Sequence, residues 1–182
     1  MIIGAIEAGG TKFICGLGDE KGNVLEKVSF PTTTPEETMK QVIKYFKDKK
    51  FDAMGIGSFG PINPIKSTEK YGYILKTPKA HWSNYDILGE LKKHFDVPME
   101  FDTDVNGAAL AESWIGAGEG LKNVMYITVG TGIGAGAVVD GKMLHGLSHP
   151  EMGHINVKRH SQDNYEGKCP FHKDCLEGLA AG

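Results

Sequence analysis

The sequence has few of the features that mark secreted, membrane-spanning or nucleic-acid-binding proteins. Its 182 residues include only three cysteines, which cannot all pair, so we expect reduced thiols and a cytoplasmic protein. The net charge is −3 and no basic block occurs, so composition gives no support for binding to nucleic acid. The apolar runs are far too short to span a bilayer, and the apolar run after Met1 lacks the basic region of a signal peptide. We therefore expect neither nucleic acid nor membrane as a partner.

What is present is the composition of a globular α/β protein. Hydrophobic residues make up 40% of the chain and charged residues 24%, a normal balance for a folded domain. Two amphipathic segments predict helices, which begin at Thr34 and Ser83. Pro35 at the first helical position and Glu37 in a capping box support Thr34 as an N-cap. Short apolar runs predict strands at 2–6, 13–17, 24–30, 53–57, 98–101, 124–129 and 133–139.

A Cys-x2-His-x2-Cys arrangement near the end of the chain is typical of a metal-binding knuckle. Its three side chains can face one point, and an upstream histidine can complete the four ligands of a structural zinc site. The alternative is that these are unrelated residues on a polar loop, but that alternative does not explain why two cysteines occur there. Glu151 and Glu177 stand beside the predicted ligands, so a bound metal would also fix two carboxylates. The predicted zinc ligands, here called the metal cluster, are His154, Cys169, His172 and Cys175.

Two glycine-rich turns each join a pair of predicted strands. In the first, Gly9 and Gly10 let backbone N–H groups approach an anion, and Thr11 and Lys12 add side-chain donors. The second is the segment 130–132, followed by Asp140-Gly141, the strongest short hairpin signal in the chain. One such turn is weak evidence for a phosphate-binding site, whereas two such turns in one chain are stronger evidence.

Asp104 stands where a predicted strand meets a predicted helix that ends at Gly116. In open α/β sheets, ligands lie at the carboxyl ends of the strands. A carboxylate there can accept the proton of a hydroxyl group or cap the helix, and the two roles are compatible. The segment 62–82 has no periodicity and is expected to form a long loop, a kind of segment that is often functional.

Several motifs, in order along essentially the whole chain, resemble the ROK family of sugar kinases and repressors, and within it the fructokinase branch. The resemblance implies an α/β actin-like ATPase (ribonuclease H-like) fold, with a complete first lobe over 1–116 and a partial second lobe over 117–182. The glycine-rich turns would then be the duplicated phosphate hairpins of that fold. The motifs are Glu7–Lys12, Ser58–Pro61, Thr77–Lys79, Thr103–Asn106, Gly130–Gly136, Glu151 with His154, and the cysteine-rich knuckle that ends at Glu177-Gly178.

The resemblance implies an ATP-dependent hexose kinase, most closely a fructokinase that forms fructose 6-phosphate. Asp104 falls on the family's catalytic base. Zinc would be structural, Mg²⁺ would lie between the phosphates, and the partners would be a sugar and ATP, in a homodimer. Thr77-Pro78-Lys79 with Trp82 matches a segment near the family's sugar cleft, the alternative being a bare surface loop. The implied sugar-binding residues are Gly60, Asn106, Glu151, His154 and Glu177, and the implied phosphate-binding residues are Gly9, Gly10, Thr11, Lys12, Thr131 and Gly132.

Other functions stay open. Glucose, mannose or N-acetylmannosamine could replace fructose as the substrate. A sugar-responsive repressor of the same fold would need a DNA-binding segment before the first hairpin, which begins at Ile2. A non-catalytic sugar-binding fragment is a further alternative, because family members continue past Gly182 with an adenine-side motif and helices. We accordingly expect the 182 residues alone to be inactive as a kinase, and the apolar face of the second-lobe strands to be exposed.

Overall fold

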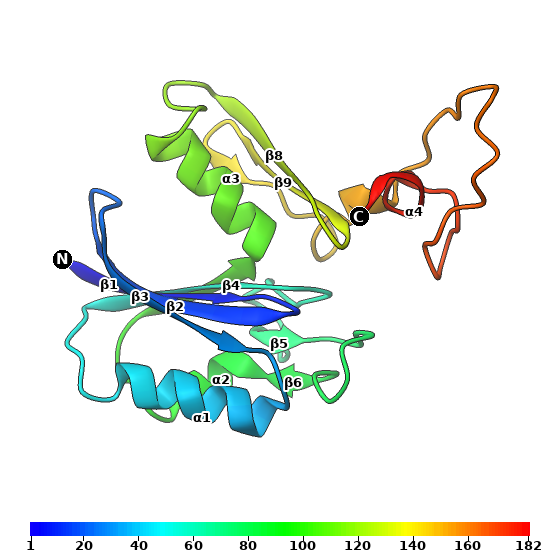
Figure 1. Cartoon of the computed structure of the whole chain (residues 1–182). Helices are drawn as coiled ribbons and strands as arrows, with labels where there is room; N and C mark the ends of the chain where they lie inside the picture. The colour runs from blue at the N-terminus through cyan, green and yellow to red at the C-terminus, as the bar shows by residue number, and fades with distance from the viewer. The chain divides into compact units, whose positions relative to one another are not determined.

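The computed structural model describes residues 1–182 and divides into two compact units (Figure 1). Unit 1 comprises Met1–Asp104 with Leu147–His149. Unit 2 comprises Val105–Gly146 with Pro150–Gly182. The longest helices have 12 residues each, and no helix could span a bilayer.

Unit 1 is built on a five-stranded mixed sheet in the order β3-β2-β1-β4-β7. β2 pairs antiparallel with both β1 and β3, whereas β1–β4 and β4–β7 are parallel pairs. The predicted glycine-turn hairpin is therefore confirmed as β1 and β2. The strands are β1 (Ile2–Ala8), β2 (Lys12–Asp19), β3 (Val24–Pro31), β4 (Ala53–Ser58) and β7 (Met99–Thr103), with a separate pair β5 (Tyr73–Ile74) and β6 (Tyr85–Asp86).

Two helices, α1 (Pro35–Phe46) and α2 (Ile87–Lys92), lie on the same face of this sheet (Figure 1). The predicted start of α1 is confirmed, because the Thr34 hydroxyl accepts a hydrogen bond from the N–H of Glu37 at 3.3 Å. The apolar stripe of α1 is buried in the core, and each such side chain contributes about 1.5–3 kcal/mol. Its buried apolar residues are Met39, Val42 and Phe46.

The sequence predicted that the second helix begins at Ser83, and this prediction is wrong. Its N-cap is Asp86, whose carboxylate accepts a hydrogen bond from the N–H of Gly89 at 2.8 Å. The start is displaced because β6 keeps the residues before α2 extended, in antiparallel pairing with β5. Ser83 instead closes a turn with Thr77, accepting from its N–H at 3.1 Å and donating to its carbonyl at 3.0 Å.

Trp82 is a core residue, which corrects the alternative that it lies on a bare surface loop. Its side chain is 0% exposed, and its indole N–H donates to the carbonyl of Thr33 at 2.8 Å. The ring centroid of Trp82 lies 5.2 Å from that of Phe13, 5.8 Å from Phe59 and 5.3 Å from Tyr85. The predicted loop over 62–82 is thus anchored in the core of unit 1 by its last residue, and it also contains β5.

Unit 2 contains a three-stranded antiparallel sheet in the order β10-β9-β8. Asp140 and Gly141, with φ of 48° and 74°, form the predicted tight turn between β9 and β10. The other elements carry the functional segments described below. The elements of unit 2 are α3 (Asp104–Ile115), whose first residue belongs to unit 1, β8 (Asn123–Val129), β9 (Ile133–Val139), β10 (Lys142–Met143), the 3₁₀ helix η1 (Met152–His154) and α4 (Leu176–Ala180).

Helix α3, which precedes the predicted lobe boundary at Gly116, packs on β9. A Cβ atom at Gly136 would come within 2.2 Å of the carbonyl oxygen of Val105. The Asn106 side chain accepts a hydrogen bond from the N–H of Ala137 at 3.3 Å and donates to the carbonyl of Leu144 at 3.2 Å. These contacts group α3 from Val105 onward with unit 2, so that the compact units divide after Asp104.

An apolar face of β8 is exposed, as the sequence analysis expected. Met125, Ile127 and Val129 alternate along the strand and are 58%, 56% and 63% exposed. Alternate residues of a strand point to the same face, so these side chains form one apolar stripe. β8 is also an edge strand of the three-stranded sheet.

Candidate active site and metal centre

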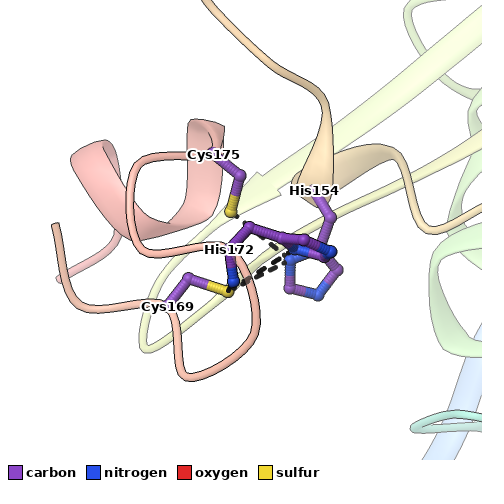
Figure 2. A group of neighbouring side chains, drawn as sticks. All are labelled: His154, Cys169, His172 and Cys175. Atoms are coloured by element: carbon purple, nitrogen blue, oxygen red, sulfur yellow. Dashed lines mark hydrogen bonds between the residues drawn. The ribbon is translucent and has the colours of Figure 1, made fainter.

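The four residues of the metal cluster come together in unit 2 (Figure 2). Their ligand atoms all lie within 4.8 Å of one another. Nδ1 of His154 lies 3.5 Å from Sγ of Cys175 and 3.6 Å from Sγ of Cys169, and Nδ1 of His172 lies 3.8 Å from Sγ of Cys169. In a tetrahedral zinc site with bonds of about 2.0–2.3 Å, neighbouring ligand atoms are about 3.3–3.8 Å apart. These three distances match that spacing, and two thiols with two imidazoles are a donor set that fits zinc.

The knuckle that carries Cys169 and His172 is a tight turn closed by backbone hydrogen bonds. Cys169 and Lys173 exchange N–H to carbonyl bonds at 3.3 and 2.9 Å. The turn closes because Lys173 adopts a left-handed conformation with φ of 57°. The N–H of His172 then points at Sγ of Cys169, at 3.4 Å.

Cys175 is the N-cap of α4, a role that the sequence analysis did not assign. Its sulfur accepts from the N–H of Gly178 at 3.5 Å, which directs the side chain back over the start of the helix. The N–H of Leu176 donates to the carbonyl of Ile155 at 2.9 Å and joins the two segments that hold the ligands. The backbone hydrogen bond between Leu176 and Ile155 thus places His154 opposite the knuckle.

The two thiols of the cluster differ in acidity. Burial raises the pKa of the Cys169 thiol, but N–H donors from His172 and Phe171, with the neighbouring Cys175, outweigh it and bring the pKa to about 6. Burial raises the pKa of Cys175, and the neighbouring Cys169 adds to the effect. One thiolate is therefore formed easily, and the second forms when a cation offsets the repulsion between them.

Glu177, a predicted sugar-binding residue, lies beside the metal cluster. One carboxylate oxygen, Oε1, is 3.9 Å from Nε2 of His154. The other, Oε2, accepts a hydrogen bond from the N–H of Ile133 at 2.9 Å. Glu151, also predicted to bind sugar, precedes η1, and its carbonyl accepts from the N–H of His154 at 3.0 Å.

The second glycine-rich turn lies between β8 and β9. The N–H of Gly130 donates to the carbonyl of Gly132 at 2.9 Å, and Thr131 at its tip is exposed. Gly132 packs against Glu177, because a Cβ atom there would come within 2.8 Å of the Glu177 carboxylate. The structure therefore brings the turn at 130–132 and the metal cluster to neighbouring positions within unit 2.

The predicted site residues of unit 1 gather at one edge of its sheet. β1, β4 and β7 are adjacent parallel strands, so their carboxyl ends lie side by side. Gly9 follows β1, Gly60 lies two residues beyond β4, and Asp104 follows β7. The N–H of Phe59 donates to the carbonyl of Ala8 at 2.8 Å and ties two of these ends together. This edge is where open α/β sheets bind ligands.

The first glycine-rich turn exposes its donors. The N–H of Gly9 donates to the carbonyl of Lys12 at 3.0 Å, and Gly10, Thr11 and Lys12 are exposed. The hydroxyl of Thr32 donates to the carbonyl of Gly9 at 2.7 Å and fixes the turn. Sequence reasoning missed Thr32, because it belongs to no motif and reaches Gly9 only through the pairing of β2 with β3.

Gly60 and Asn106 are held by contacts that the sequence did not predict. The Gly60–Pro61 peptide is cis, and the carbonyl of Gly60 accepts from the Thr77 hydroxyl at 3.2 Å. Asn106 is 1% exposed, and both ends of its amide are engaged with the backbone of unit 2, as described above. Its contribution to a sugar site would therefore be made from a side chain that also holds α3 against β9.

Comparison with known proteins gives consistent matches. The profile of the ROK family matches residues 3–182. A fructokinase from Pediococcus pentosaceus is 50% identical over 182 residues, covering 100% of this chain and 63% of that protein. A fructokinase from Lactococcus lactis subsp. cremoris is 50% identical over 180 residues, covering 98% and 61%. A glucokinase from Halalkalibacterium halodurans is 31% identical over 191 residues, covering 97% and 55%.

A solved structure supports the same grouping. The crystal structure of a ROK family glucokinase from Streptomyces griseus, in complex with glucose and AMPPNP, superposes with a TM-score of 0.81 at 27% identity, covering 100% of this chain and 57% of that one. The sequence-based prediction of the fold is thereby confirmed. The chain spans about three fifths of the length of the curated relatives it matches.

Proposed function

Because this chain belongs to the ROK family, we propose that the protein to which it belongs is an ATP-dependent fructokinase that forms fructose 6-phosphate. The observation that carries the proposal is the identity of the chain to two fructokinases, 50% in each case, against 31% to a ROK glucokinase. The gathering of Gly9, Gly60 and Asp104 at the carboxyl edge of the sheet of unit 1 supports it.

In this proposal Asp104 is the general base. Phosphoryl transfer depends mainly on positioning and electrostatic stabilisation, with a carboxylate to accept the proton of the attacking hydroxyl. Asp104 is the first residue of α3, and the partial positive charge of a helix N-terminus favours the ionised carboxylate. A base in this place would act on the sugar hydroxyl that attacks the γ-phosphate.

The two glycine-rich turns would hold the phosphates of ATP. Both expose groups near the tip of a hairpin, with Thr11 and Lys12 on the first and Thr131 on the second. The lysine supplies a positive charge, and the glycines allow close approach of backbone N–H groups to phosphate oxygens. Mg²⁺, held largely by the phosphates themselves, would neutralise charge that develops during transfer.

Zinc in the metal cluster would have a structural role. Two thiols and two imidazoles complete a tetrahedral set, so no ligand position is left for a substrate. Binding would order the segment from 154 to 175, because metal-binding energy in such a site is folding energy. His154 would use Nδ1 for the metal and turn Nε2 towards Glu177 or a sugar hydroxyl.

The proposed sugar-binding set includes residues from the segment that zinc would order. Glu151 and Glu177 are carboxylates that can accept hydrogen bonds from hydroxyl groups, and they flank the metal ligands in sequence. Gly60 and Asn106 complete the proposed set, the latter as a support.

A substrate panel at fixed ATP concentration tests the proposal. The assay uses this chain extended to the full length of its fructokinase relatives, with fructose, glucose, mannose and N-acetylmannosamine as acceptors. We expect kcat/KM to be highest for fructose, and product analysis to give fructose 6-phosphate. A higher kcat/KM for another hexose would assign the protein to another ROK kinase activity, and no ATP turnover with any sugar would contradict the kinase proposal. Light scattering of the same sample tests the predicted homodimer.

A further inference from the structure

Ile133, the first residue of β9, is held on two sides by the segment that carries the metal cluster. Its N–H donates to Oε2 of Glu177 at 2.9 Å. Its carbonyl packs so closely on η1 that a Cβ atom at Gly153 would lie 1.8 Å from the carbonyl oxygen. Gly153 immediately precedes His154, and Glu177 lies in the first turn of the helix that Cys175 caps. Both contacts on Ile133 thus come from neighbours of metal ligands.

Glu177 also faces the ring of His154. Nδ1 of that ring points at both cysteine sulfurs, at 3.5 and 3.6 Å, while Nε2 on its far side lies 3.9 Å from Oε1 of Glu177. With a metal on Nδ1, the ring proton resides on Nε2 and faces the carboxylate. A carboxylate behind a ligating histidine fixes the tautomer and the ring orientation, and strengthens the ligand.

The same carboxylate packs against the second glycine-rich turn. Oε2 of Glu177 occupies the space that a side chain at Gly132 would need, with 2.8 Å to the position of its Cβ. At the other end of the turn, the N–H of Gly182 donates to the carbonyl of Gly130 at 2.7 Å. The turn at 130–132 is therefore supported by Glu177, in the first turn of α4, and by Gly182, two residues after the helix.

We propose that Glu177 is a positioning residue that couples occupancy of the metal cluster to the conformation of the turn at 130–132. One oxygen orients the metal ligand His154, and the other holds the N–H that follows the turn. Loss of the metal would release His154 and α4, and with them the support of Ile133. The meaning of this coupling for catalysis rests on the proposed function, in which Thr131 and Gly132 contact phosphates, but the coupling itself does not.

Two substitutions separate the two contacts of Glu177. In Glu177→Gln the amide oxygen can still accept from Ile133, but the NH₂ group then faces the N–H of His154, donor against donor. In Glu177→Ala both contacts are lost. Glu166→Ala serves as the matched control, because Glu166 is an exposed carboxylate in the same segment.

The experiment measures zinc affinity by competition with a chelator, and hydrogen exchange of the Ile133 amide by NMR, in the 182-residue chain. We expect removal of zinc from the wild-type chain to speed Ile133 exchange about 10-fold or more. Glu177→Gln should lower zinc affinity about 10- to 100-fold and keep Ile133 protected when zinc is saturating. Glu177→Ala should lower affinity similarly and expose Ile133 to exchange even with zinc bound, while Glu166→Ala changes neither quantity.

Equal Ile133 exchange in zinc-loaded and zinc-free wild-type chain would overturn the proposal, as would wild-type affinity and protection in Glu177→Ala. Neither measurement uses sugar or ATP. A protein without kinase activity that behaves as expected here would therefore contradict the proposed function and leave this inference standing.

Discussion

Nδ1 of His154 lies 3.5 Å from Sγ of Cys175, although 21 residues separate them in sequence. A histidine that ends a 3₁₀ helix is thereby placed against a cysteine that caps an α-helix. The contact has the spacing of two ligands of one zinc ion. A zinc ion bound between these two residues would order the whole segment from 154 to 175.

The first prediction is that dialysed protein contains about one zinc per chain. Cys169→Ser should reduce the zinc content to near zero, because Cys169 lies within reach of two imidazole nitrogens in the cluster. Cys15→Ala should keep the zinc, since Cys15 is buried in β2, in unit 1. Elemental analysis of the three proteins measures the content. A disulfide between Cys169 and Cys175 with no metal would contradict the prediction.

The second prediction concerns the acidity of the thiols in metal-free protein. We expect thiolate absorbance at 240 nm to show one thiol that ionises near pH 6, and Cys169→Ser to abolish that step. Burial raises the pKa of Cys15 to about 12, and the pKa of Cys175 is also raised, so neither should contribute there. A titration with no thiolate below pH 8 would show that the donors to Cys169 are absent.

The same shift has a consequence for stability. The pKa of folded Cys169 lies below its ordinary value of 9.0, so the folded state binds this proton less tightly than the unfolded state. The contribution of the ionised Cys169 thiol to the free energy of unfolding is therefore fully present above pH 9 and is lost as the pH falls through about 6. Denaturation of metal-free chain should show this loss, and Cys169→Ser should remove it.

The third prediction is that Asp104→Asn, in protein extended to the full length of its relatives, lowers kcat by about 10²–10⁴-fold and leaves sugar affinity largely intact. The amide keeps the size of the side chain but cannot accept the proton. Asp102→Asn is the matched control, an equal change two residues earlier in β7, and should keep near wild-type kcat. Steady-state kinetics and sugar titration measure the two quantities. An Asp104→Asn enzyme with wild-type kcat would leave Asp104 as a helix cap alone.

The fourth prediction tests the packing of α3 on β9. Gly136→Ala should lower the free energy of unfolding by about 1–3 kcal/mol or more, because the new Cβ would meet the backbone of Val105 at 2.2 Å. Gly55→Ala, the matched change in β4, has no atom within 4 Å of the new Cβ and should be neutral or stabilising by up to about 1 kcal/mol. Urea denaturation compares the two. Equal stability of the variants would mean that α3 does not pack on β9 in this way.

Local signals in the sequence were sufficient for much of the fold. Thr34 caps α1 and Asp140-Gly141 turns the chain because such features depend on residues within a few positions. The metal cluster could be predicted for a related reason, since three of its four members lie within one short knuckle. The junction at Asp104 could be predicted because an apolar strand run is followed at once by residues that favour a helix.

Tertiary structure alone decided the features that depend on pairing between distant segments. Ser83 has the chemistry of an N-cap, but pairing of β5 with β6 keeps the chain extended to Asp86, so the helix starts there. Trp82 looked like a loop residue, and its burial follows from packing on Phe13 and on the carbonyl of Thr33. These partners are 49 residues or more away in sequence, beyond the range of any cap or turn rule.

Glu177 shows the same division within the site. Its place two residues after a cysteine of the knuckle, and its match to the family motif, marked it as functional. The bond from Ile133, 44 residues earlier, depends on how α4 and η1 pack on the start of β9. The sequence alone determined which groups are available for chemistry, because metal ligands, candidate bases and turns can be recognised from a few neighbouring residues. The tertiary structure decided which of them support one another, because hydrogen bonds and close packing between distant segments exist only after the chain has folded.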